Sequence, residues 1–200
     1  MNQFDQFQNA LSLETVSDKT FRINPDSRYF VGKTPHGGYL NALMHKALIL
    51  SVPHSVAISS SIQYLERIEA KDIILQVEVF KVSRGSSSGM VKLIQDNKIC
   101  TVFNAICSDF EHMKGYDGLK TPPPEIIKEV SREDYKNLNY DKISPGFTPS
   151  FIHQLSCRVH PHHAWWDRDL GSDEADARCS SYVQMDGGIP DQFVLSFYVD

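Results

Sequence analysis

The spacing of hydrophobic residues changes several times along the chain, and each change predicts an element. Residues 10–16 (ALSLETV) alternate apolar and polar side chains, and residues 19–23 follow after a short polar break. Alternation with a period of two puts every second side chain on one face, so these stretches predict two short paired strands. The turn-forming residues 24–27 (NPDS) come next.

From Gly38 the apolar residues are spaced as in a helix, and Pro53 limits how far that helix can run. The apolar side chains fall three and four residues apart in one stripe: Leu40, Leu43, Met44, Ala47 and Leu48. The sequence PHGG stands directly in front of this stripe, although glycine disfavours helices. Two explanations stay open: a sharp turn with close packing, or bare amides that bind a carbonyl oxygen or phosphate.

Four strand-like segments follow the helix, at residues 55–65, 72–83, 86–95 and 99–109. The second of them, IILQVEVFKV, alternates apolar and polar residues and predicts a strand with one wet face. The connections at 84–86 and 96–98 have hairpin length. The sequence therefore predicts a four-stranded antiparallel meander, which buries the apolar helix by wrapping around it.

The pattern breaks at residues 112–149, where three successive prolines and a charged run predict an extended linker. It then restarts: residues 151–160 and 177–185 are strand-like, and DGGIPD precedes an apolar helical run. This predicts an N-terminal unit at 1–111, the linker, and a partial second unit at 150–200. We expect the second helix to expose an apolar face: Phe193, Val194, Phe197 and Tyr198.

Composition narrows the class of protein. The net charge is −5, and no block of lysine or arginine suggests nucleic acid binding. The opening MNQFDQFQNA does not resemble a secretory signal, and no apolar run is long enough for a membrane span. The four cysteines form no CxxC pair, which indicates reduced thiols in a cytoplasmic protein.

Histidines raise two further possibilities. His160, His162, His163 and Asp167 lie in one proline-containing loop, but this spacing does not by itself build a tetrahedral metal site. We therefore expect a histidine-rich loop and no metal. His36 precedes the helix, where no serine or cysteine nucleophile lies nearby, so it is expected to cap, pack or contact substrate rather than act as a base.

Three stretches together resemble the double-hotdog acyl-CoA thioesterases related to bacterial acyl-CoA thioesterase II. They are residues 35–48, which begin PHGG, residues 54–105, and residues 182–200. The middle stretch holds an Arg-Gly-x-Ser turn and a Gln-Asp-Asn-Lys run before a strand. The resemblance implies an α+β hotdog fold, a long helix wrapped by a curved antiparallel sheet. It also implies a tandem double hotdog, with the second unit incomplete.

The resemblance also implies the chemistry, which is hydrolysis of acyl-CoA thioesters without a metal or organic cofactor. The family's catalytic Asp on the second hotdog helix corresponds to Asp200, and its Thr/Ser and Gln partners would lie beyond that residue. An arginine on the turn after the second strand suits CoA phosphates. The candidate substrate-binding residues are His36, Gly37, Gly38, Gln63, Arg84 and Ser86.

Three alternatives stay open at this point: an active thioesterase, a non-catalytic module that binds acyl-CoA, or a truncated, inactive paralogue. In each, the partner is the acyl-CoA small molecule, with no nucleic acid and no membrane span. Like other hotdogs, the protein is expected to form a homo-oligomer through its sheets, and open sheet edges favour such association.

Overall fold

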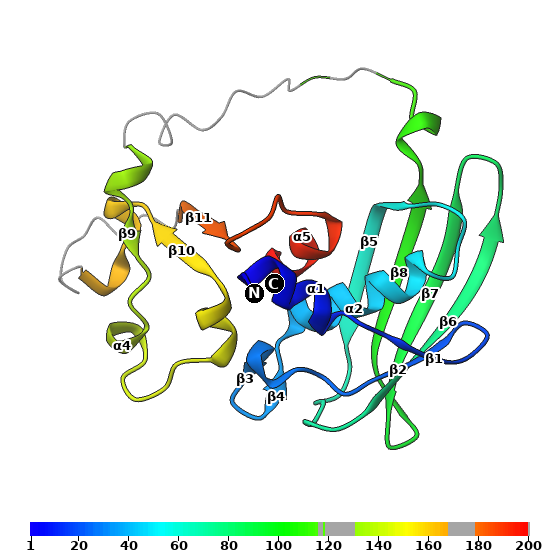
Figure 1. The fold of residues 1–200 in the computed structure, drawn as a ribbon, viewed down its shortest axis with the longest axis horizontal. Coiled ribbons are helices and arrows are strands. Elements are labelled where there is room, and N and C mark those ends of the chain that lie inside the picture. The colour runs from blue at the N-terminus through cyan, green and yellow to red at the C-terminus, as the bar shows by residue number, and fades with distance from the viewer. Residues whose placement is uncertain (116–117, 119–130, 168–178, 200) are drawn as a thin grey trace.

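The structure, a computed structural model, describes residues 1–115, 118, 131–167 and 179–199. Six antiparallel strands form its largest sheet, in the order β1-β2-β6-β7-β8-β5 (Figure 1). Their bounds are β1 Glu14–Ser17, β2 Thr20–Ile23, β5 Val56–Tyr64, β6 Ile73–Val82, β7 Ser87–Gln95 and β8 Lys98–Ser108. The predicted hairpin and all four predicted strands are present.

The order of the strands differs from the prediction. Only β6, β7 and β8 form a meander, because β5 pairs with β8 at the far edge of the sheet. The loop after β5 folds over β8, where the amides of Leu65 and Glu66 donate to Cys100 O at 2.8 and 3.0 Å. A strand's neighbours depend on such distant contacts, which the period of one segment does not contain.

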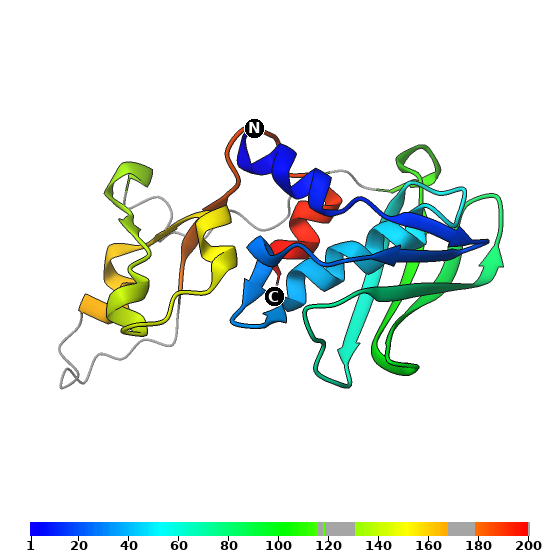
Figure 2. The same ribbon diagram turned by 60° about the horizontal axis from the view of Figure 1, so that its bottom comes forward.

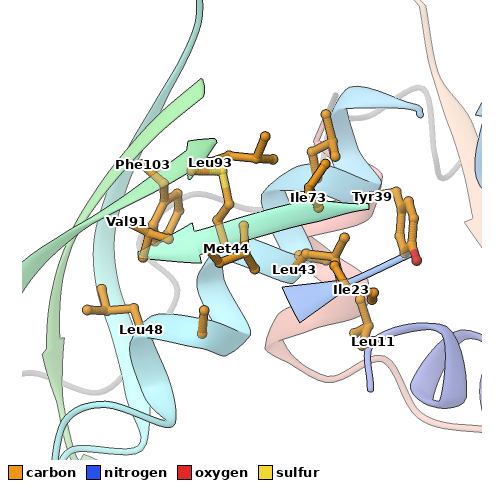
Figure 3. Packing of buried hydrophobic residues seen from close by; sticks show 14 of the residues in the cluster. Leu11, Ile23, Tyr39, Leu43, Met44, Leu48, Ile73, Val91, Leu93 and Phe103 are labelled. Atoms are coloured by element: carbon orange, nitrogen blue, oxygen red, sulfur yellow. The ribbon is translucent and has the colours of Figure 1, made fainter. Parts of the chain in front are cut away.

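Helix α2, Gly37–Ile49, lies along the inner face of this sheet, as predicted (Figure 2). Every residue of the predicted stripe is at most 2% exposed. Figure 3 shows Met44 and Leu48 packing with Val91, Leu93 and Phe103 of the sheet, and Leu43 lying beside Ile23 and Ile73. The helix ends four residues before Pro53.

The opposite side of α2 is also covered. Helix α1, Gln3–Ala10, begins where Asn2 Oδ1 accepts a hydrogen bond from the Asp5 amide. Phe7 and Leu11, four residues apart, are both fully buried. The prediction that a strand begins at residue 10 is therefore wrong for Ala10, which ends this helix, and β1 begins only at Glu14.

A second, three-stranded sheet has the order β11-β10-β9. Its strands are β9 Lys136–Asn137, β10 Ser156–Val159 and β11 Ser181–Gln184; β3 Phe30–Val31 and β4 Thr34–Pro35 form a separate pair. Within the described ranges, the remaining helices are α4 Tyr140–Ile143, α5 Gln192–Tyr198 and six 3-10 turns, Ser27–Tyr29, Phe110–His112, Arg132–Asp134, Ser150–Gln154, Pro161–His163 and Trp165–Asp167. Residues 151–154 were predicted as strand but are one of these turns.

Helix α5 is not left open, and the expectation of an unburied apolar face is wrong. It packs on α2 beside α1, so the first and last described helices lie together near the middle of the molecule (Figure 1). Val194 and Phe197 are 0% and 1% exposed, and Phe193 and Tyr198 are partly buried against the same core. None of the described helices has both the length and the apolar character needed to cross a membrane.

Candidate functional site

The PHGG sequence forms a tight turn between β4 and α2. The His36 amide donates to Tyr29 O at 2.9 Å, and the extended backbone of His36 (φ −62°, ψ 140°) caps the helix without a side-chain hydrogen bond. Gly37 is the first helical residue, so its amide precedes the first intrahelical donor, Leu40 N, which bonds to His36 O at 3.1 Å. The turn therefore presents the positive end of a long helix.

Gly38 serves the packing of the two helices. A Cβ atom at this position would lie 2.3 Å from Phe197 O and about 3 Å from two other backbone atoms of Phe197 in α5. Only glycine allows the backbones to approach this closely. The close-packing explanation of PHGG therefore holds for Gly38, with the difference that its partner is α5 rather than the sheet.

A groove of about 410 Å³ opens on one side of the turn, which is the size range of small-molecule sites. One wall is β4 and the start of α2, and the other is the end of β5 with the loop that follows. Its lining residues are Thr34, Pro35, Gly37, Leu40, Tyr64, Leu65, Glu66, Arg67 and Ile68. Leu40 and Ile68 are buried and apolar, whereas Glu66 and Arg67 are exposed. The groove is therefore apolar inside and charged at its rim.

A hydrogen bond ties the two walls together, since Arg67 Nε donates to Thr34 Oγ1 at 2.9 Å. Tyr64 is 46% exposed and lines the groove. Nothing in the periodicity links Thr34 to Arg67, which lie 33 residues apart. Sequence reasoning missed this pair for that reason.

A smaller cavity of about 160 Å³ lies on the other side of the turn, against the second sheet. The His36 ring forms part of its lining and stacks on Phe151, with ring centroids 4.0 Å apart. Phe197 and Tyr198 of α5 complete this side, and burial raises the pKa of the Tyr198 phenol. His36 thus packs between the two parts of the chain.

Helices α2 and α5 share a row of buried polar contacts. Asn41 Nδ2 donates to Ser196 O at 3.0 Å, and His45 Nδ1 lies 2.9 Å from Ser196 Oγ. Because the Ser196 hydroxyl donates to Gln192 O at 2.9 Å, His45 must be the donor to Ser196. Burial lowers the pKa of His45 to about 4, so its ring is neutral at pH 7. These contacts fix α5 on α2 and supply no activated nucleophile.

The structure separates the other predicted site residues from the groove. Gln63 is exposed on the opposite face of β5 from Ile62, which packs on the core. Arg84 and Ser86 lie in the turn between β6 and β7, at the other end of the sheet. Thr101, opposite Tyr64, and Cys107, opposite Ser87, are six positions apart along β8, which corresponds to about 20 Å. Asp200 lies outside the described residues.

The histidine-rich loop is held by its own backbone. His160 Nδ1 accepts from His162 N at 3.2 Å, and His163 Nδ1 accepts from Ser180 N at 2.9 Å. His160 and His163 are both buried, and Asp167 is instead paired with Lys136 and Lys142 at 2.9 and 2.6 Å. Each ring therefore has a capping or packing role in this loop.

The part of the chain that forms the turn and the groove is similar to a known protein family. Residues 25–108, which contain the turn and the groove, match the family model of the acyl-CoA thioesterase N-terminal domain. No curated protein matches the sequence.

The fold as a whole is similar to several solved structures. A Thermobifida fusca protein assigned as a thioesterase II has a TM-score of 0.77 and 16% identity, over 98% of this chain and 71% of that one. A hot dog fold protein of unknown function from Alicyclobacillus acidocaldarius has a TM-score of 0.76 and 15% identity, over 97% and 68%. An acyl-CoA thioesterase II from Mycobacterium marinum has a TM-score of 0.66 and 14% identity, over 96% and 67%. The predicted resemblance to the thioesterase II-like superfamily and the α+β hotdog fold are confirmed.

Proposed function

We propose that this protein hydrolyses acyl-CoA thioesters to the free acid and CoA, with the PHGG turn at the centre of its substrate site. The observation that carries the proposal is the groove beside Gly37, which lies within the stretch that matches the thioesterase family model. The tandem double-hotdog arrangement and a location in the cytoplasm are part of the same proposal.

The acyl group is assigned to the groove between α2 and the loop after β5. Pro35, Leu40 and Ile68 offer it an apolar lining, and burying each methylene of an acyl chain contributes about 0.8 kcal/mol. The exposed Arg67 at the rim supplies the cation that sequence reasoning assigned to Arg84. A guanidinium fork pairs well with the phosphates of CoA.

The hydrolytic step needs a donor for the developing oxyanion and a base for water. We assign the Gly37 amide to the oxyanion and Asp200 to the base. The water oxygen bonds to the thioester carbonyl carbon while its proton passes to Asp200. The tetrahedral intermediate then collapses, the C–S bond breaks, and CoA leaves as the thiol with that proton.

A free-thiol assay with acyl-CoA esters of increasing chain length tests the proposal. We expect turnover by the whole chain, and its loss by about two to four orders of magnitude in Asp200→Asn. Asp186→Asn, the same change in an exposed side chain before α5, serves as the matched control and should keep full activity. Turnover unchanged in Asp200→Asn would remove Asp200 as the base. Binding of acyl-CoA without thiol release would favour the non-catalytic module.

A second experiment tests the assignment of the CoA end. Arg67→Gln should raise KM for acyl-CoA about tenfold, since a hydrogen bond to a charged group contributes about 1.5–3 kcal/mol and this one is exposed. KM for the same acyl group on N-acetylcysteamine, a thiol without phosphates, should stay the same. Arg84→Gln should change neither value. An equal effect of Arg84→Gln and Arg67→Gln would refute the assignment of the phosphates to the groove rim.

We further propose that the protein forms a homo-oligomer through its hotdog sheets. In the described part of the chain, β5 pairs on one side only, with β8, and Ile58 at its bulge is 51% exposed. An open edge of this kind favours pairing with another chain. Light scattering coupled to size-exclusion chromatography checks the mass, and a monomer at micromolar concentration would refute this part.

A further inference from the structure

Three potential metal ligands meet at the end of the sheet that is remote from the groove. His54 lies between α2 and β5, and Asp109 and His112 both follow β8, so two distant parts of the sequence converge. One ligand atom from each residue lies within 4.8 Å of the others. His54 is buried, at 4% exposed, whereas Asp109 is partly exposed and His112 is exposed. The cluster has no part in the proposed hydrolysis.

Hydrogen bonds to neighbouring residues orient two of the three side chains. His54 Nδ1 lies 2.6 Å from Ser87 Oγ, and Nε2 makes a long hydrogen bond of 3.4 Å to Arg84 O. Asp109 Oδ1 accepts from both the amide and the hydroxyl of Ser55, at 2.8 and 2.7 Å. Its other oxygen, Oδ2, points at His112 Nδ1 across 3.6 Å. Ligands of bound metals are typically held in this way by partners on their second polar atom.

We propose that His54, Asp109 and His112 bind a zinc ion at this end of the sheet. Zinc bonds to imidazole nitrogen and carboxylate oxygen are about 2.0–2.2 Å long, so two ligands of a tetrahedral site lie about 3.4 Å apart. The separation of 3.6 Å between Asp109 and His112 is already close to that value. The exposed His112, in a short 3-10 turn, has freedom to close the remaining distance to the buried His54.

The chemical types of the three ligands determine which metal ion fits. Two imidazoles and one carboxylate suit zinc, whereas calcium and magnesium take oxygen ligands almost exclusively. With three protein ligands, water occupies the fourth position on the exposed side of His112. The ion joins the loop before β5 to the segment that leaves β8, and Ser87 ties it to β7. It therefore stabilises the folded sheet end, about 20 Å from the groove along β8.

Isothermal titration of the metal-free full chain with zinc chloride tests this site. We expect one ion per chain, a higher Tm with zinc, and cobalt(II) absorption bands of tetrahedral geometry. His112→Ala and Asp109→Asn change side chains that are not fully buried, so both variants should fold and both should lose stoichiometric binding and the Tm shift. His153→Ala removes an exposed histidine outside the cluster and should bind zinc as the unmodified chain does.

Ser87→Ala tests whether the orientation of His54 contributes to zinc binding. It leaves all three ligands in place but removes the hydroxyl that orients His54, and it should weaken zinc binding about 10- to 100-fold. Zinc binding that is unaffected by His112→Ala and Asp109→Asn, or no stoichiometric binding at all, would overturn the proposal. In that case the three side chains form an ordinary polar cluster that closes the sheet end. Neither outcome depends on thioester turnover.

Discussion

Replacing Gly38 by alanine tests whether the contact between α2 and α5 holds the two parts of the chain together. The added Cβ atom would lie 2.3 Å from Phe197 O, whereas ordinary van der Waals contact begins near 3.4 Å. The obstacle is backbone, so no side chain can rotate away from it. The two helices must therefore separate by about 1 Å, or α5 must detach.

The expected cost follows from what the contact buries. Overpacking of this kind costs about 1–3 kcal/mol when the neighbouring element shifts. If α5 detaches, Val194 and Phe197 become exposed, at about 1.5–3 kcal/mol each. Alanine favours a helix over glycine by up to about 1 kcal/mol, which offsets part of this cost. We therefore expect the free energy of unfolding to fall by up to about 2 kcal/mol if the helices move apart, and by about 2–5 kcal/mol if α5 detaches.

Urea unfolding, followed by far-UV circular dichroism, measures the change as a lower midpoint. Gly85→Ala is the matched control, because a Cβ atom there meets nothing within 4 Å and the backbone is not in the left-handed region. That variant should be neutral or more stable by about 0.4–1 kcal/mol. If Gly38→Ala proved as stable as Gly85→Ala, the reasoning about the helix contact would be refuted.

Two further predictions concern the same interface. The pKa of His45 is lowered to about 4 in the fold from 6.5, so its contribution to stability is complete above pH 6.5 and is lost as the pH falls towards 4. The free energy of unfolding, measured with urea across this range, should fall by about 3 kcal/mol because of His45. In His45→Gln the free energy of unfolding should depend less on pH, and an equally steep dependence would contradict the assignment. Asp191 caps α5 by accepting from Phe193 N and Val194 N at 2.9 and 2.8 Å, so Asp191→Ala should cost about 1–2 kcal/mol by thermal unfolding. Asparagine also caps helices well, so Asp191→Asn should be about as stable as the unmodified chain. An equal loss of stability in Asp191→Ala and Asp191→Asn would refute the capping role.

Part of the site could be predicted from the sequence, and part could not. PHGG was recognisable as the start of α2, because an apolar stripe with helical spacing follows it directly. Which of its two glycines packs and which lines a groove depends on Phe197, about 160 residues away, and no local pattern contains that contact. Arg84 was chosen because it stands on a turn, but the strand register puts that turn at the wrong end of the sheet.

The sequence by itself determined the elements that depend on local spacing: the stripe of α2, the strands β5 to β8, and the tight turns between β6, β7 and β8. Tertiary structure decided which of these elements are neighbours. The pairing of β5 with β8 and the burial of α5 against α2 are contacts between distant segments. Periodicity reports only that a face must be buried, and the partner that buries it is the one whose shape and hydrogen bonds fit.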